Sequence, residues 1–331
     1  MSEDRRIGAW FLGWMVGLPF IVYLFSPEVL LYLRVVGAVD SWDSWMWSAW
    51  TGIGLLVVFI LSFMTVRIWC APVSVWYVAL AGIAVHLLLL PVRVAVRYLP
   101  PQTNYGLAEG RLAYIIGASP FGAAGRYSEG VLPMLAPYAF AAVGYLIAMA
   151  LGCWLGGIGR EAEGESRRLG VWFLGWMVGL PVLSYVFSPE ALLFVARVFK
   201  IPGFRGIYFV VIALGLAVAF VLSLLAVRRW RAPTSLWYVP LAGLLVSVVL
   251  PPIRIMAQIV ARFDGLVAPR TIQLPLWNIA GVTPFGPAGL ESPSISDMLI
   301  PYAFAMIGYL LAVSLGCWFA ARRAHATNAS G

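Results

Sequence analysis

The sequence predicts an all-α polytopic integral membrane protein, with eight transmembrane helices arranged as two tandem four-helix repeats. Of its 331 residues, 62% are hydrophobic and only 11% are charged, whereas about a quarter of the residues of a soluble domain are charged. Several apolar runs are about 20 residues long, the length that a helix needs to cross a bilayer. The segment Trp10–Pro19 recurs letter for letter as Trp172–Pro181. This identity opens an internal repeat that continues to the end of the chain.

Each expected span of the first half has a counterpart in the second half. We place the first four spans at residues 7–25, 48–69, 74–97 and 137–157, and the second four at 169–187, 207–229, 235–260 and 301–320. The two repeats cover residues 1–159 and 169–323, with a polar linker at 160–168 and a polar tail at 324–331. Because the first apolar run reappears in mid-chain, it is expected to be a membrane span and not a cleaved signal peptide.

The expected topology follows from the number of spans and from the residues at their ends. Four spans return the chain to its starting side, so the repeats are expected to be parallel and related by a pseudo-two-fold axis along the membrane normal. Arginines flank one set of span ends, which the positive-inside rule assigns to the cytoplasm together with both termini; the long loops then lie on the outer face. The same ends carry a belt of tryptophans: Trp10, Trp69, Trp76 and Trp154, repeated as Trp172, Trp230, Trp237 and Trp318.

Three features distinguish the outer face. Ser26-Pro27-Glu28 and Ser188-Pro189-Glu190 each have the pattern of a helix start, with serine as N-cap, proline at the first helical position and glutamate complementing the helix dipole. Two loops, Ser119–Gly125 and Thr283–Gly289, share a Pro-Phe-Gly core. These loops are either re-entrant elements or surface turns. Four tryptophans of the first half alone form an expected docking surface for a partner: Trp42, Trp45, Trp47 and Trp50.

Small residues four apart lie on one helix face and let two membrane helices approach closely. In the first and last spans of each half they predict a close-packed core made by spans one and four, within a half or across the axis. The glycines that carry this prediction are Gly13, Gly17, Gly144, Gly152, Gly175, Gly179, Gly308 and Gly316.

His86 lies near the middle of the third span, where an ionisable residue is a candidate for function. Two interpretations stay open. In the first, His86 ligates a haem or pigment, contacts a quinone or relays a proton. In the second, it is a neutral imidazole bonded to a neighbouring helix. Two haem-ligating histidines are excluded, because His325 lies in the tail. The three cysteines, Cys70, Cys153 and Cys317, lack metal-ligand spacing. We therefore predict no metal site and no firm cofactor.

Arg93 and Arg254 follow the prolines Pro91 and Pro252 toward the outer end of the third spans. Arginine binds carboxylate or phosphate in a forked geometry, so the pair is a candidate anion site. The alternative is that both side chains extend to the lipid headgroups.

The pattern of charges excludes several functions. No aspartate or glutamate falls inside an expected span, which disfavours ion-coupled carriers and cation pores. The net charge of +8 comes from arginines scattered at span ends, so nucleic acid is not an expected partner. No catalytic motif is present, and no catalytic residue is assigned.

The sequence leaves three functions open. The first is a non-catalytic scaffold or anchor of a larger membrane complex, with the bilayer, other membrane subunits or a second copy as partners. The second is a channel or facilitator for a small neutral or anionic solute. The third is a quinone- or pigment-binding redox subunit that uses His86. In architecture alone, two four-helix bundles without haem ligands resemble the membrane subunits of polysulfide-reductase-type respiratory complexes.

Overall fold

The computed structural model describes residues 3–26, 29–30, 33, 44–98, 131–159, 164–188, 191–192, 195, 199, 207–262 and 295–329. These residues are 92% helical, and no strand occurs among them. The helices of the first half are α1 (Glu3–Leu24), α3 (Ser44–Arg67), α4 (Tyr77–Tyr98) and α6 (Val131–Gly157). Those of the second half are α7 (Gly164–Val186), α9 (Tyr208–Trp230), α10 (Tyr238–Arg262) and α12 (Ile295–Ala329). Short 3₁₀ turns, η1 (Val73–Trp76) and η4 (Thr234–Trp237), precede α4 and α10.

Within the described residues, six helices are long and apolar enough to cross a membrane: α1, α3, α6, α7, α9 and α12. The predicted class, a helical integral membrane protein, is therefore borne out. The apolar described parts of the remaining two helices are shorter and cover Val73–Leu89 and Thr234–Leu250. Several helices also extend beyond the expected spans; among them, α7 begins inside the linker at Gly164 and α12 continues into the tail as far as Ala329.

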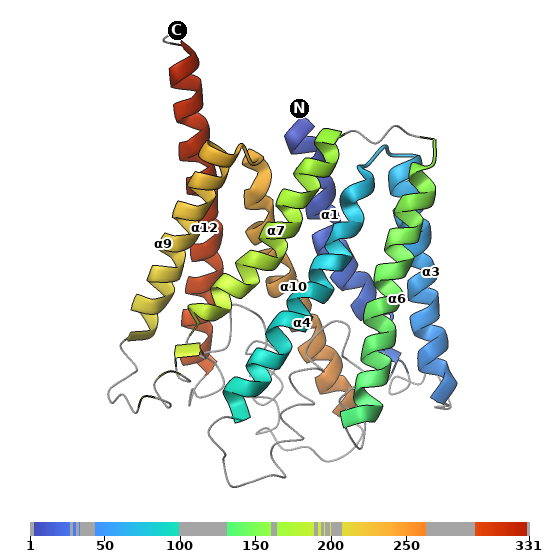
Figure 1. The fold of residues 1–331 in the computed structure, drawn as a ribbon. Helices are drawn as coiled ribbons and strands as arrows, with labels where there is room; N and C mark the ends of the chain where they lie inside the picture. Colours follow the sequence, from blue (N-terminus) through green and yellow to red (C-terminus); the bar gives the residue numbers. More distant parts are fainter. Residues whose placement is uncertain are drawn as a thin grey trace.

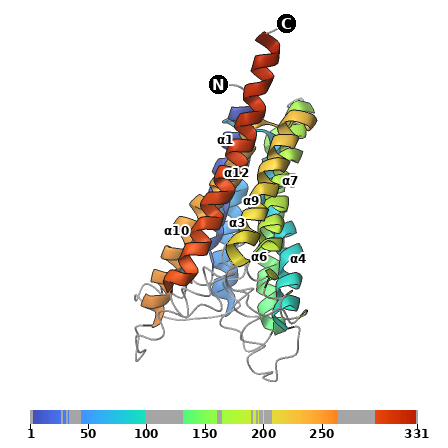
Figure 2. The ribbon, with the colours of Figure 1, turned by 90° about the vertical axis from the view of Figure 1, so that its left-hand side faces the viewer.

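The helices form a central group flanked by two pairs (Figure 1). The pairs α3–α6 and α9–α12 lie at opposite edges, and α1, α4, α7 and α10 lie between them. The view in Figure 2 separates the central helices into two layers, with α1 and α10 in one and α4 and α7 in the other. Both chain ends lie at the same end of the bundle (Figure 1).

In the flanking pairs, glycines of the fourth helix contact the second helix of the same half. A Cβ atom added to Gly152 would meet Ser62 Oγ and would lie 2.5 Å from the carbonyl oxygen of Phe59 on α3. Its counterpart Gly316 would meet Ser223 Oγ and lie 2.7 Å from the carbonyl oxygen of Phe220 on α9. Backbone atoms cannot move aside for a side chain here, so only glycine permits this approach.

This pairing differs from the predicted one, in which spans one and four formed the tight core. Gly144 and Gly308 likewise approach Leu55 of α3 and Leu216 of α9. The four glycines of the first helices that carried the prediction lie elsewhere: a Cβ added to any of them would find no heavy atom within 4 Å in the described structure. These glycines are Gly13 and Gly17 on α1 and Gly175 and Gly179 on α7.

The first helix of each half crosses over to the third helix of the other half. Gly8 of α1 meets Ser235 of η4, whose Cβ would lie 2.8 Å from an added Cβ. Gly170 of α7 meets Ser74 of η1 in the same way, at 2.6 Å. Hydrogen bonds reinforce both contacts: Ser235 Oγ donates to the carbonyl oxygen of Asp4 at 3.1 Å, and Ser74 Oγ donates to that of Ser166 at 3.3 Å.

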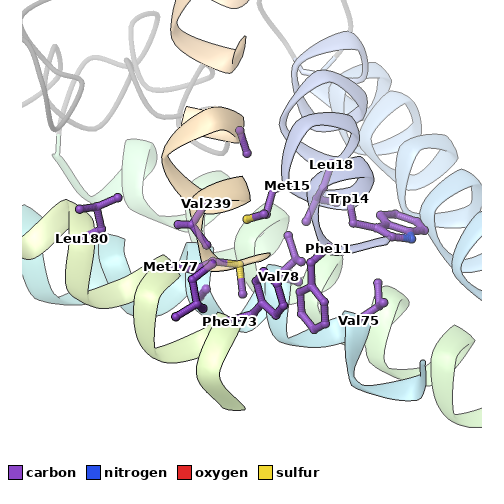
Figure 3. Packing of buried hydrophobic residues seen from close by; sticks show 14 of the residues in the cluster. Phe11, Trp14, Met15, Leu18, Val75, Val78, Phe173, Met177, Leu180 and Val239 are labelled. Atoms are coloured by element: carbon purple, nitrogen blue, oxygen red, sulfur yellow. The ribbon is translucent and has the colours of Figure 1, made fainter. Parts of the chain in front are cut away.

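Between these two crossings, the rings of Phe11 and Phe173 stack on one another with centroids 4.6 Å apart and planes 7° from parallel. Figure 3 shows them facing each other among buried side chains of both halves. A stacked aromatic pair contributes about 0.5–1.5 kcal/mol beyond the area that it buries. The surrounding side chains include Met15, Met177, Val78 and Val239.

The ends of the first and second helices in each half are joined by tryptophans. Trp10 stacks on Trp69 with centroids 6.3 Å apart, and Trp172 stacks on Trp230 at 6.4 Å. The start of one helix and the end of the other therefore lie at the same level, as the predicted tryptophan belt requires.

Replacing Gly152 by leucine is expected to destabilise the fold, because the new side chain has to displace the backbone of α3. Forced packing of this kind costs about 1–3 kcal/mol or more. We expect a large loss of monodisperse protein after detergent extraction and a lower melting temperature. The control is Leu151→Ile, at a neighbouring position that is exposed in the structure. Equal behaviour of the two variants would contradict the α3–α6 seam.

Candidate functional site

His86 is half-buried on α4, and its ring bonds to its own helix. Its Nδ1 atom lies 2.6 Å from the carbonyl oxygen of Gly82, one turn earlier. A carbonyl oxygen can only accept, so Nδ1 carries the hydrogen and donates it. In the neutral ring, Nε2 then holds the lone pair that a metal, a quinone hydroxyl or another donor would use. This bond lies within α4, and the predicted bond to a neighbouring helix stays a prediction.

The equivalent position in the second half is Ser247 on α10. Here the neighbouring fourth helix makes the contact: Tyr302 Oη of α12 donates to the carbonyl oxygen of Ser247 at 3.5 Å. The two third helices therefore differ in chemistry at matched positions.

Among the residues that the structure describes, no group of three His, Cys, Asp or Glu side chains gathers to hold a metal ion. Cys153 and Cys317 are buried, and Cys70 is exposed.

Arg93 and Arg254 lie on the helical backbone of α4 and α10, but their side chains are outside the described structure. Their helices continue through Pro91 and Pro252 to Tyr98 and Arg262. The prolines therefore do not end the third helices. The predicted anion site at these arginines stays a prediction.

Of the four tryptophans expected to form a docking surface, two have described side chains, and both contact other helices of the chain. Trp47 packs edge-on against Phe140 of α6, with ring centroids 6.5 Å apart. Trp50 Nε1 donates to the carbonyl oxygen of Leu24 at 3.1 Å, which ties the start of α3 to the end of α1. Trp42 and the side chain of Trp45 lie outside the described residues.

The predicted helix start at Ser188 is confirmed. Ser188 Oγ accepts a hydrogen bond from the backbone N–H of Ala191 at 3.3 Å, which is the bond of an N-cap serine. At Ser26 the backbone carbonyl accepts from the N–H of Leu30 at 3.3 Å, as at the first turn of a helix. The Pro-Glu pairs that follow both serines, and the loops 119–125 and 283–289, lie outside the described residues.

Two buried tyrosines form a further matched feature that the sequence analysis did not identify. A Cβ added to Gly54 of α3 would meet the hydroxyl of Tyr145 on α6, and one added to Gly215 of α9 would meet that of Tyr309 on α12. Both tyrosines are 1% exposed. The sequence does show a glycine in the second span and a tyrosine in the fourth span at matched positions of both halves. It does not show that these two helices pack against each other.

Exposed arginines gather where α9 ends beside α12. The side chains of Arg228, Arg229, Arg231 and Arg322 are all exposed. Arg322 lies over the ring of Trp318, with its guanidinium carbon 3.9 Å from the ring centroid. In the first half, Arg67 Nη1 instead donates to the carbonyl oxygen of Ile158 at 3.1 Å.

The sequence matches no protein-family model, and no curated protein or solved structure shows significant similarity to it.

We expect that His86→Ser leaves the assembled protein intact, because the second half carries serine at the matched position. Its free energy of unfolding should change by less than about 0.5–1.5 kcal/mol, the net value of one hydrogen bond. Thermal melts and visible spectra of the purified wild-type and variant proteins check this. Loss of an absorption band or of a co-purified quinone in the variant would instead identify His86 as a cofactor residue.

Proposed function

We propose that this protein is a non-catalytic membrane subunit that serves as the scaffold of a larger membrane complex. The observation that carries the proposal is a glycine face on α1 and on α7 that meets no neighbour among the residues that the structure describes. No atom of the described structure lies within 4 Å of a Cβ placed on these glycines, which are Gly13, Gly17, Gly175 and Gly179.

Glycine in a helix interior is unfavourable by about 1 kcal/mol relative to alanine. In a membrane, the close packing of a second helix against the glycine backbone offsets this cost. Gly152 and Gly316 have such neighbours inside the chain, whereas these four glycines of α1 and α7 have none among the described residues. A helix of another subunit, or of a second copy, supplies the missing neighbour in the proposed complex.

The letter-for-letter identity of Trp10–Pro19 and Trp172–Pro181 supports the same proposal. Contacts inside the chain account for part of this identity, because Phe11, Trp14 and Leu18 are buried. They do not account for the outward glycines. A partner that contacts both halves would require the same residues on the outward face of α1 and of α7, which explains why the outward glycines are identical in the two segments.

The proposed scaffold has eight spans in two parallel repeats, with the chain termini in the cytoplasm. At 22 and 25 residues, α4 and α10 are about 33–38 Å long, enough to cross the hydrocarbon core. Matched contacts in the two halves support a two-fold relation: the Gly8–Ser235 and Gly170–Ser74 approaches, and the Gly152–Ser62 and Gly316–Ser223 approaches.

Replacing Gly13 and Gly175 together by leucine should release the partner without unfolding the chain. The new side chains fill a face with no internal neighbour, so the melting temperature should stay close to wild type. After gentle detergent extraction, the native mass is expected to fall to that of the free chain. Val143→Leu is the matched control, since Val143 is exposed on α6 and its counterpart is Ile307. A wild-type assembly that has the mass of one chain, or a double variant that keeps the full mass, would contradict the scaffold.

Reporter tags inserted at Arg160 and Arg323 should lie in the same compartment, the cytoplasm. Four proposed spans lie between the two tag positions, and an even number of crossings returns the chain to the same side of the membrane. Accessibility of each tag to a membrane-impermeant reagent, in intact and permeabilised cells, measures this. Tags in opposite compartments would exclude the parallel arrangement.

A further inference from the structure

We propose that the cytoplasmic end of α9 and α12 binds the headgroup of an anionic phospholipid. The site consists of Arg228, Arg229, Arg231 and Arg322, called the arginine cluster below. All four side chains are exposed in the structure.

The first half provides the comparison, because the two halves end their second helices alike. Ala71 N–H donates to the carbonyl oxygen of Thr65 at 3.1 Å, and Ala232 N–H donates to that of Ala226 at 3.0 Å. Cys70 and Arg231 both adopt the left-handed conformation, with φ of 55° and 53°. The backbone is therefore the same, and the helix end does not require the extra arginines.

At this shared backbone the two halves carry different side chains. Arg67 corresponds to Arg228, so one arginine is common to both. The other three arginines of the cluster, Arg229, Arg231 and Arg322, replace Ile68, Cys70 and Ile158 of the first half. The second half has thus concentrated positive charge at a place where the first half is mainly apolar.

The cluster is carried by two helices that pack against each other: α9 ends at Trp230, and α12 continues past Arg322 to Ala329. Phe220 of α9 contacts Phe319 of α12 with ring centroids 6.3 Å apart, one to two turns below the cluster. In the first half, the matched side chain of Arg67 reaches the backbone of Ile158. Within the described residues, Arg228, Arg229 and Arg231 form no ion pair, and the described acidic side chains at this end of the bundle are Glu3 and Asp4 on α1. A phosphate bound between the guanidinium groups removes their mutual repulsion.

The surface below the cluster favours a lipid over a free anion. Trp230 and Trp318 are 52% and 44% exposed at the level where tryptophans contact headgroups. Leu315 and Phe319 continue an exposed apolar surface toward the membrane centre. A phospholipid satisfies both parts at once, with its phosphate at the arginines and its acyl chains along the apolar side chains. Basic clusters beside membrane helices bind anionic lipids on this principle.

The test uses the full-length purified protein and three probes: dioleoylphosphatidylglycerol in mixed detergent micelles, dioleoylphosphatidylcholine in the same micelles, and inorganic phosphate. We expect a saturable rise in melting temperature with phosphatidylglycerol and none with the other two. Equal stabilisation by phosphatidylcholine would refute an anion site. Equal stabilisation by inorganic phosphate would make it a free-anion site and overturn the lipid assignment.

The decisive variant gives the second half side chains like those of the first: Arg229→Ile, Arg231→Ser and Arg322→Ile. Because the first half folds with similar side chains, this triple variant should remain folded and should bind phosphatidylglycerol on the order of 100-fold more weakly. The control is Arg5→Gln, Arg6→Gln and Arg167→Gln, which removes equal charge at the same end of the bundle. Equal weakening in the control would show diffuse surface charge and overturn the site. If the triple variant does not fold, Arg229→Ile alone provides the comparison, and unchanged affinity in it overturns the site.

Discussion

The close approach of helix backbones at glycine is the constraint on which the rest of this structure depends. Lipid is as apolar as the side chains that it covers, so burial of apolar surface does little to bring membrane helices together. Contact has to come from fit, and two such close fits lie where Gly8 meets Ser235 and Gly170 meets Ser74. These two crossings join the halves, and the stacked rings of Phe11 and Phe173 fill the space between them.

Glycines spaced along a membrane helix pack in two different ways in this chain, and the difference supports the proposed function. Gly152 of α6 and Gly316 of α12 pack against the second helix of their own half, whereas Gly13 of α1 and Gly175 of α7 are exposed in the described structure. The first helices use their other face, with Phe11 and Phe173, to hold the halves together. Their outward glycines then make no packing contact with the part of the chain that the structure describes. A scaffold role explains them, because a partner helix in a complex completes the same kind of contact that α3 makes with α6.

The duplicated halves share a backbone but differ at their surfaces. His86 stands where the second half has Ser247, and arginines stand where the first half has Ile68 and Ile158. Matched positions in the two halves therefore serve as an internal comparison. Where the backbone is the same but the side chains differ, the difference reflects what surrounds the helix pair. On this reasoning the arginine cluster is matched to its lipid environment, and the bond from His86 to Gly82 is a local feature of α4.

The sequence by itself determined the helical membrane class, the identity of Trp10–Pro19 with Trp172–Pro181, and the helix start at Ser188. Each depends on composition or on neighbours along the chain. Only the tertiary structure decided that the fourth helix pairs with the second, that Gly13 and Gly175 face outward, and that Tyr145 covers Gly54. Helical periodicity tells which residues share a face, but in a membrane the buried and the lipid-facing sides are both apolar. The pattern therefore does not reveal which neighbour a face meets, and that choice is made by the fit between whole helices.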